Sequence, residues 1–224
     1  MPHFDIVKKN HPENTFRVSK ICADFDVRPD HSNEHFVGDI EIPGEWSIGA
    51  IVGGSGTGKS TIAKELFKKE LVEKFHYRAA SVIDDMPNAP VDKITKMFYS
   101  VGFGSVPSWL KPYSVLSNGE KMRVDLARAL LERDFVVFDE FTSVVDRQVA
   151  QTASIAIGKA VRKAGKKLVV VSCHYDILDW LEPDWVFDTN TMSNFFGTAH
   201  DRKSNLKSGD AVTGSGQNLG VIII

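Results

Sequence analysis

The chain has 224 residues, of which 42% are apolar and 25% are charged, and its formal net charge is −2. This length suits one α/β domain with a sizeable core and leaves little room for two domains. The near-neutral charge gives no electrostatic footprint for nucleic acid, and two cysteines exclude a disulfide framework. The N-terminus lacks a signal-peptide pattern, and no apolar run reaches the ~20 residues that span a bilayer. We therefore expect a cytoplasmic protein, in which a partner would supply any membrane part.

The apolar patterning predicts strands and helices that alternate along most of the chain. In chain order, strands are expected over residues 15–28, 34–42 and 46–52, a helix from Ser60 to about Phe75, a strand over 79–83 and a helix over 92–101. A loop over 102–117 precedes a helix over 119–133, a strand over 134–139, a helix over 147–164, and strands over 167–172 and 185–188. The first two strands have no helix between them and are expected to make a small antiparallel β subdomain. The remainder predicts an α/β fold with a mainly parallel sheet.

The C-terminal part of the chain differs in composition from the rest. From residue 197 onward the sequence is rich in Gly, Ser, Asn and Asp, which favours a mostly disordered tail over 197–224. We therefore expect a single domain over residues 1–196.

One glycine-rich segment carries the strongest chemical signal in the sequence. Residues 53–60 read GGSGTGKS, which fits the phosphate-loop pattern G-x-x-x-x-G-K-[ST], and they lie between a predicted strand and a predicted helix. The glycines let backbone N–H groups wrap the β-phosphate, and the N-terminal end of the following helix adds positive potential. Lys59 would reach the β- and γ-phosphates, and the Ser60 hydroxyl would ligate Mg²⁺. The candidate nucleotide-binding residues here are Gly53, Gly54, Ser55, Gly56, Thr57, Gly58, Lys59, Ser60 and Thr61.

Two acidic residues, Asp139 and Glu140, directly follow the apolar run of residues 135–138. An apolar strand followed by acids is common by itself, but the phosphate loop upstream favours a functional interpretation. Asp139 would hold Mg²⁺ through its water shell, opposite Ser60, and Glu140 would act on the attacking water.

Five motifs in a fixed order resemble those of the ABC (ATP-binding cassette) ATPases over about residues 45–190. Besides the phosphate loop and the acidic strand end, residues 116–120 (LSNGE) resemble the family's LSGGQ signature. Residues 143–146 (SVVD) resemble its D-loop, and His174 resembles its switch histidine. The resemblance implies a P-loop NTPase fold with an ABC ATPase core, a small antiparallel β subdomain and a reduced helical subdomain.

The resemblance also implies how the site would work, with ATP and Mg²⁺ as cofactors. Two copies would pair head to tail in an ATP-dependent homodimer, each ATP lying between the phosphate loop of one copy and the signature of the other. Ser117, Gly119 and Glu120 would contact the partner's ATP, and Ser117 and the Gly119 N–H would bind its γ-phosphate. The residues that would carry out catalysis are Lys59, Glu140 and His174.

The chain departs from the family's pattern at the Q-loop and in the length of the helical insert. Asp84 and Asp85 stand where the Q-loop glutamine is expected. Asp84 is the candidate to touch Mg²⁺ or its water, although which of the two acids replaces the glutamine stays open. Lys59 and Ser117 are only 58 positions apart (117 − 59), which leaves room for about two short helices.

ABC proteins often stack the adenine ring on an aromatic residue near the end of the first strand. Phe25 lies there in the predicted element order, so it is the candidate adenine contact. A core phenylalanine is an equally good interpretation.

The short insert resembles that of a small group of soluble ABC-type ATPases, some of which are fused to a predicted acetyltransferase domain. We therefore expect a soluble ATPase that acts on a macromolecule or a partner enzyme, with nucleic acid as a partner class that the charge does not support. The alternative is a nucleotide-binding subunit of a membrane transporter. That alternative is less expected, because Lys93, Lys96 and Lys111 make the insert look solvated. A binding switch with little turnover is the third alternative.

Overall fold

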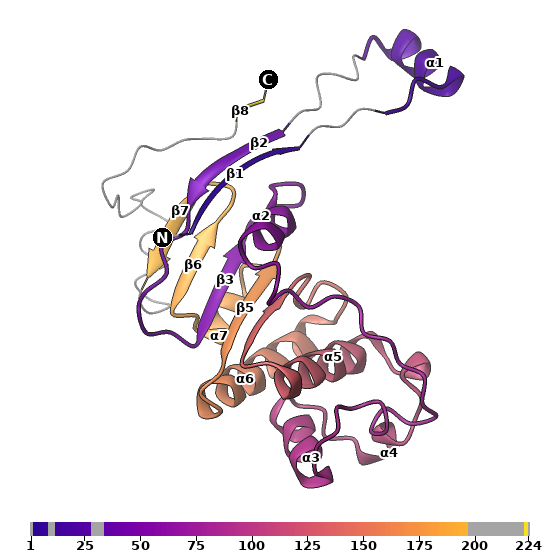
Figure 1. Ribbon diagram of the computed structural model, residues 1–224, viewed down its shortest axis with the longest axis vertical. Coiled ribbons are helices and arrows are strands. Elements are labelled where there is room, and N and C mark those ends of the chain that lie inside the picture. The colour runs from indigo at the N-terminus through magenta and orange to yellow at the C-terminus, as the bar shows by residue number, and fades with distance from the viewer. Residues whose placement is uncertain (1, 9–11, 28–33, 197–221, 224) are drawn as a thin grey trace.

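The computed structural model describes residues 2–8, 12–27, 34–196 and 222–223 of the chain, and two β-sheets organise them (Figure 1). One sheet has the strand order β4-β5-β3-β6-β7, and the other has the order β1-β2-β8. The strands are β1 (His3–Lys8), β2 (Glu34–Asp39), β3 (Ile48–Val52), β4 (Phe135–Phe138), β5 (Lys167–Ser172), β6 (Trp185–Asp188), β7 (Ser193–Phe196) and β8 (Ile222–Ile223). The helices are α1 (Phe16–Phe25), α2 (Lys59–Leu66), α3 (Val91–Ser100), α4 (Val106–Trp109), α5 (Asn118–Glu132), α6 (Arg147–Lys163) and α7 (Ile177–Leu181), with a 3₁₀ helix η2 (Tyr113–Val115).

The five-stranded sheet is parallel except at one edge. Strand β3 pairs in parallel with β5 on one side and β6 on the other, and β4 extends the parallel ladder beyond β5. Only β7 runs antiparallel, against β6. All five residues of β3 are buried, as expected for a central parallel strand that is covered on both faces. The predicted α/β fold with a mainly parallel sheet is therefore confirmed.

Each face of this sheet packs against a different set of elements. Helix α2 and the β1–β2 ribbon cover one face, where Ile51 of β3 shares a cluster with Ile62 of α2 and with Phe4 and Phe36. Helices α5, α6 and α7 cover the other face, where Ile48, Ala50 and Val52 point into a second and larger cluster. Burying each large apolar side chain contributes about 1.5–3 kcal/mol, so these two clusters hold the strand ends in fixed positions.

The predicted elements of the core are confirmed with small changes at their ends. They are β3, α3, α5, β4, α6, β5 and β6. The predicted antiparallel subdomain also exists, but its strands are β1 and β2, which pair from His3 opposite Asp39 to Lys8 opposite Glu34.

The strand predicted over residues 15–28 is wrong, because this segment forms helix α1. The Thr15 hydroxyl caps the helix by accepting the Val18 N–H, and Asp26 ends it in the left-handed region with φ of 49°. Val18, Ile21, Cys22 and Phe25 recur at helical spacing, although the same segment also contains the alternation that suggested a strand. Without a neighbouring strand to pair with, local capping decided the outcome.

The helix predicted from Ser60 to Phe75 is too long, and the strand predicted over 79–83 is absent. Helix α2 ends at Leu66, and the chain then runs beside the edge strand β4, where Leu71 pairs with Val137. The Val72 N–H donates to the Val137 carbonyl at 2.8 Å. An edge strand offers unpaired backbone groups, so this extended pairing competes with the helix. The segment 79–86 is a series of turns instead of a strand.

The expected tail lies mostly outside the described residues. Of residues 197–224, the structure describes only β8, which pairs antiparallel with Glu34 and His35 of β2. No helix in the described part of the chain is long and apolar enough to cross a membrane.

Candidate functional site

The phosphate loop emerges from the buried strand β3 and runs directly into helix α2. Gly53 has φ of 153° and Gly58 has φ of 86°, both positive values that favour glycine. A Cβ on Gly53 would lie 2.1 Å from the Thr189 hydroxyl oxygen, and one on Gly58 would lie 2.7 Å from the Phe36 ring. Both glycines are therefore required by backbone conformation and by the close approach of neighbouring residues.

The loop is held by hydrogen bonds within itself and to the end of β6. The Lys59 ammonium donates to the Gly54 carbonyl at 2.5 Å, and the Thr57 hydroxyl donates to the same carbonyl at 2.9 Å. The Gly54 N–H donates to the Asn190 side-chain oxygen at 3.0 Å. Lys59 thus extends back across the loop and places its positive charge beside the loop backbone. This arrangement suits a phosphate group.

Sequence reasoning missed the residues after β6 that support the loop. Asn190 donates from its amide nitrogen to the Tyr175 hydroxyl, which in turn donates to Asp188, both at 2.8 Å. Burial, together with the bond to Asp188, raises the pKa of Tyr175. This series of hydrogen bonds links the phosphate loop to the segment that carries His174. No local pattern in the sequence marks Asn190, because its partners lie 15 and 136 residues away.

Three candidate residues or motifs lie after neighbouring parallel strands. The phosphate loop follows β3, His174 follows β5, and Asp139 and Glu140 follow β4. Because β5 lies between β3 and β4, the carboxyl ends of these strands meet at one edge of the sheet. The fold therefore gathers the predicted phosphate-binding, acidic and histidine residues at this edge.

The acidic strand end has an unusual backbone. Glu140 adopts φ of 52°, and its N–H is accepted by the Asp139 carboxylate at 2.8 Å. A non-glycine residue in the left-handed region costs about 1–3 kcal/mol, and such residues gather at functional sites. The Ser143 hydroxyl donates to the Glu140 carbonyl at 2.9 Å and helps to hold this turn. Glu140 is left exposed, so water can reach its carboxylate.

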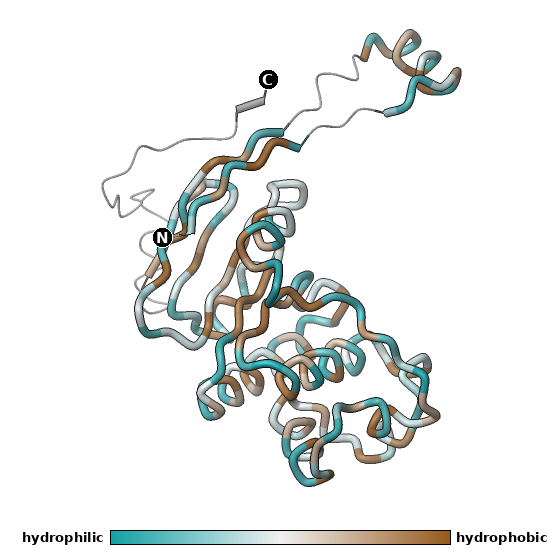
Figure 2. The backbone as a smooth tube through the Cα atoms, viewed as in Figure 1, coloured by the Kyte–Doolittle hydropathy of each residue, from teal (hydrophilic) through white to brown (hydrophobic). Residues whose placement is uncertain are grey.

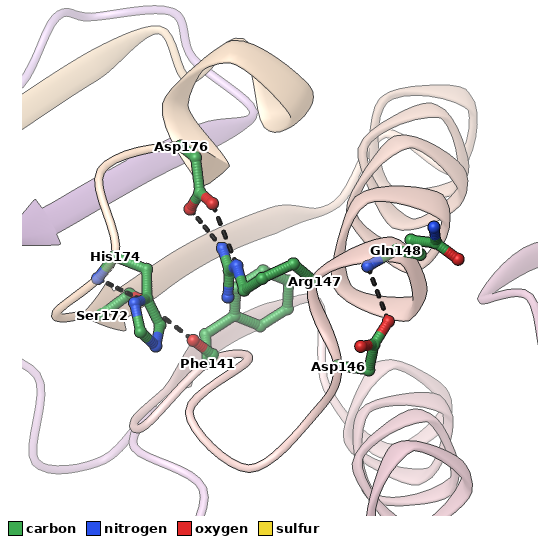
Figure 3. A network of polar contacts seen from close by, with 7 residues as sticks. All are labelled: Phe141, Asp146, Arg147, Gln148, Ser172, His174 and Asp176. Atoms are coloured by element: carbon green, nitrogen blue, oxygen red, sulfur yellow. Dashed lines mark hydrogen bonds and ion pairs between the residues drawn. The ribbon is translucent and has the colours of Figure 1, made fainter.

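Figure 3 shows how the loops after β4 and β5 are tied together. The Ser172 hydroxyl donates to the Phe141 carbonyl at 3.0 Å and accepts the His174 N–H at 3.1 Å. Further along both loops, the Arg147 guanidinium makes two bonds to the Asp176 carboxylate, one of them at 3.0 Å from Nε. These bonds fix His174 relative to the loop that carries Glu140.

Arg147 also connects two other features of this region. It directly follows Asp146, whose carboxylate caps helix α6 by accepting the Gln148 N–H at 2.8 Å. Its guanidinium carbon lies 5.0 Å from the ring centroid of Trp180 on α7. The residues resembling the D-loop are thereby anchored to the segment after His174.

The signature-like turn lies on the surface at the start of α5. Ser117 caps the helix and forms a capping box with Glu120, in which the Ser117 N–H donates to the Glu120 carboxylate at 3.0 Å and the Glu120 N–H donates back at 3.3 Å. Burial alone would raise the pKa of Glu120, but hydrogen bonds from Ser108 and Ser117 and the charge of Lys111 outweigh it and lower that pKa. The helix N-terminus faces outward with its positive potential.

A partly buried cluster of two tyrosines and one aspartate holds α5 in place. The hydroxyls of Tyr77 and Tyr113 both donate to the Asp125 carboxylate at 2.7 Å, and their rings stack with centroids 3.9 Å apart. Burial raises the pKa of Asp125, and it raises the pKa of each tyrosine as well. The segments that precede and follow α3 are thus pinned to the helix that carries the signature-like turn.

Two other predicted site residues lie in different surroundings. Phe25 is 70% exposed on helix α1, which stands far from the phosphate loop in Figure 1, so its assignment as the adenine contact is wrong. The assignment depended on the wrong strand at residues 15–28.

Asp85 accepts the N–H groups of Arg78 and Ala79 at 3.0 Å each, whereas Asp84 is exposed and accepts the Ser81 hydroxyl. A magnesium contact by Asp84 stays a prediction.

Fold and site together define a P-loop NTPase with the ABC ATPase fold, as the sequence predicted. No family model matches the chain. A curated relative is the energy-coupling factor transporter ATP-binding protein EcfA1 of Staphylococcus aureus (strain USA300), which is 27% identical over 194 residues that cover 67% of this chain and 70% of the relative. A second curated EcfA1, from the bovine strain RF122 / ET3-1, is 28% identical over 193 residues with the same coverage.

Solved structures support the same fold. The dimeric post-hydrolysis state of the ATP-binding cassette MJ0796, bound to ADP and Pi, superposes with a TM-score of 0.55 and 14% identity, covering 69% of this chain and 87% of that one. CbiO1 from Clostridium perfringens, part of the ABC transporter complex cbiONQ, superposes with a TM-score of 0.55 and 20% identity, covering 77% and 87%. The relatives and solved structures bear out the predicted enzyme class, an ABC-type ATPase. None of these relatives is named for an acetyltransferase, so that part of the expected resemblance has no support.

Proposed function

We propose that this chain binds MgATP and hydrolyses it at a site built around the phosphate loop. The observation that supports this most is the loop itself: positive-φ glycines between a buried strand and a helix, with Lys59 extending back across them. Lys59 and the backbone N–H groups of residues 53–61 hold the phosphates. Ser60 and Asp139 hold Mg²⁺, which usually takes one or two protein ligands and completes its shell with phosphate oxygens and water.

Hydrolysis requires a group that orients and deprotonates the attacking water. Glu140 suits this role, because its carboxylate is exposed at the sheet edge where the phosphate loop also ends. His174 follows the neighbouring strand β5, and its backbone N–H is held there by the Ser172 hydroxyl. We assign it the stabilisation of the γ-phosphate.

The site is completed by a second copy of the chain. Ser117 caps helix α5 at the surface and Gly119 lies in its first turn, where a helix N-terminus favours an anion, and one structure of the same fold was solved as a dimer. Each ATP would then lie between the phosphate loop of one copy and the signature-like turn of the other.

Between the two settings expected from the sequence, we now favour the transporter subunit over the soluble ATPase. EcfA1 and CbiO1 are both named as transporter components. The helical insert also exposes several large apolar side chains, although its lysines had suggested a solvated surface. They are Val91, Tyr99, Val106, Leu110 and Val115, which are 63%, 57%, 45%, 66% and 64% exposed. Exposed apolar side chains of this number in one segment are available to contact a partner protein.

The test compares the purified chain with the same chain captured from membranes. Phosphate release is first measured from the chain alone without detergent, where a catalytically complete dimer gives basal turnover. The variant Leu110→Glu is then compared with Lys93→Glu on the same insert. A membrane protein that co-purifies with the parent chain and with Lys93→Glu, and is lost with Leu110→Glu, supports the transporter setting. If no membrane protein co-purifies with any of them, the soluble ATPase is the correct setting.

A further inference from the structure

Helix α1 stands apart from the five-stranded sheet, beyond the end of the β1–β2 ribbon (Figure 1). None of its side chains is buried, and Phe16, Ile21 and Phe25 are 84%, 54% and 70% exposed. An isolated helix shorter than about 12–15 residues is only marginally stable in water. A 10-residue helix with this much exposed apolar surface therefore gains stability when something covers it.

Four apolar residues of α1 form one stripe, whereas Phe16 and Ala23 lie on the opposite face of the helix. Val18, Ile21, Cys22 and Phe25 follow the spacing i, i+3, i+4, i+7, which places them on one face of the helix. Figure 2 shows hydrophobic and hydrophilic residues side by side along this helix. Such a stripe matches the seam of a two-helix pair and points to another helix as its cover.

The charges of α1 indicate which helix that is. Arg17 and Lys20 lie in its N-terminal half, and Asp24 and Asp26 lie at its C-terminal end. A helix dipole favours acids at the N-terminus and bases at the C-terminus, so α1 carries the reverse of the favourable arrangement. An antiparallel second copy would correct this at both ends. It would bring its Asp24 and Asp26 beside the first turn, and its Arg17 beside the last turn.

We propose that α1 is a self-pairing element that joins two copies of this chain in an antiparallel helix pair. In the register that centres the stripe, Val18 of one copy lies opposite Phe25 of the other, and Ile21 lies opposite Cys22. Arg17 lies next to Asp24 of the partner on one flank of the stripe, because Arg17 and Asp24 share a helix face at the spacing i, i+7. The contact is isologous, so each interaction occurs twice and the assembly closes as a dimer.

This pairing is weak by itself and independent of nucleotide. The helix is only about 15 Å long, so the contact buries less than the ~1,200 Å² of a stable interface. It would raise the local concentration of two chains whatever their ATP-binding state. Its failure would therefore leave the proposed ATPase site untouched.

Disulfide cross-linking tests the register directly. In a chain with Lys59→Ala, Cys22→Ser and Cys173→Ser, the pair Val18→Cys with Phe25→Cys places two thiols on the stripe. The matched control, Phe16→Cys with Ala23→Cys, has the same spacing on the opposite face of α1. Under mild oxidation without nucleotide, the stripe pair should cross-link two chains at least about tenfold faster than the control pair. Equal rates for the two pairs would overturn the proposal.

A charge swap tests the partner. Arg17→Asp alone sets like charges opposite each other, so sedimentation without nucleotide should show self-association weakened about tenfold. Adding Asp24→Arg and Asp26→Arg restores opposite charges and should return the dimer constant to within about threefold of the parent chain. A parent chain that stays monomeric at high concentration overturns the proposal. Binding of that monomer to anionic lipid vesicles would identify α1 as a membrane-surface helix instead.

Discussion

The phosphate loop and the signature-like turn both begin a helix, but they are built in opposite ways. The phosphate loop follows a fully buried strand, and neighbouring side chains leave no room for a Cβ on Gly53 or Gly58. The signature-like turn lies on the surface and is held mainly by the capping box between Ser117 and Glu120. The first is enclosed by residues of its own chain, whereas Ser117 and Asn118 of the second are exposed at the surface. The difference implies that each chain holds only half of the proposed site.

The largest effect is expected at the phosphate loop. Lys59→Ala removes the ammonium that crosses the loop, so ATP binding measured by calorimetry should become undetectable or weaken by at least about 100-fold. The control is Lys64→Ala, an exposed lysine on the same helix, which should bind ATP normally. Unchanged affinity in Lys59→Ala would remove this lysine from the site.

The next effect concerns the chemical step rather than binding. Glu140→Gln keeps the shape of the side chain but loses its basicity, so turnover should fall by about 10²–10⁴ while ATP affinity stays within about threefold. Phosphate release and calorimetry on the same preparation separate the two quantities. Glu132→Gln, a charge-neutralising change at the end of α5, serves as the control. Near-normal turnover in Glu140→Gln would rule out its catalytic role.

A moderate effect is expected where the loops after β4 and β5 are tied together. Arg147→Ala removes both bonds to Asp176 and the contact with Trp180, so the segment carrying His174 should lose its fixed position. We expect kcat to fall about tenfold with little change in KM, because ground-state binding depends on the phosphate loop. Lys163→Ala at the other end of α6 is the control. A change in KM alone would indicate that Arg147 acts on nucleotide binding instead.

The smallest effect is expected in the capping box of the signature-like turn. Glu120→Ala removes one half of the box and should destabilise the fold by about 0.5–1 kcal/mol at neutral pH. Because folding lowers the pKa of Glu120, its carboxylate stabilises the folded state above the ordinary Glu pKa, and this contribution is lost as the pH falls through the lowered value. The difference between parent and variant in thermal unfolding should therefore shrink in acid. A constant difference across pH would show that the charge of Glu120 is not involved.

Features set by local sequence could be predicted, whereas features set by distant neighbours in the fold could not. The phosphate loop, the acidic strand end and the signature-like turn are local patterns, and the structure places them on the predicted strands and helices. The strand predicted at residues 15–28 failed because its apolar residues fit two periods and the helix cap at Thr15, which decides between them, was overlooked. Asn190 could not be found either, since its role depends on a contact to Gly54, which is 136 residues away in the chain. What escaped prediction was set by tertiary neighbours.

The central claim is that two half-sites combine around ATP, and molecular size tests it most directly. Glu140→Gln is run on gel filtration with and without MgATP in a chain that also carries Phe25→Glu, which keeps α1 pairing out of the measurement. We expect a monomer without nucleotide and a dimer with two bound ATP molecules when MgATP is present. Adding Ser117→Arg should return the dimer to a monomer that still binds ATP. A Ser117→Arg chain that dimerises with ATP as readily as its parent would contradict the account.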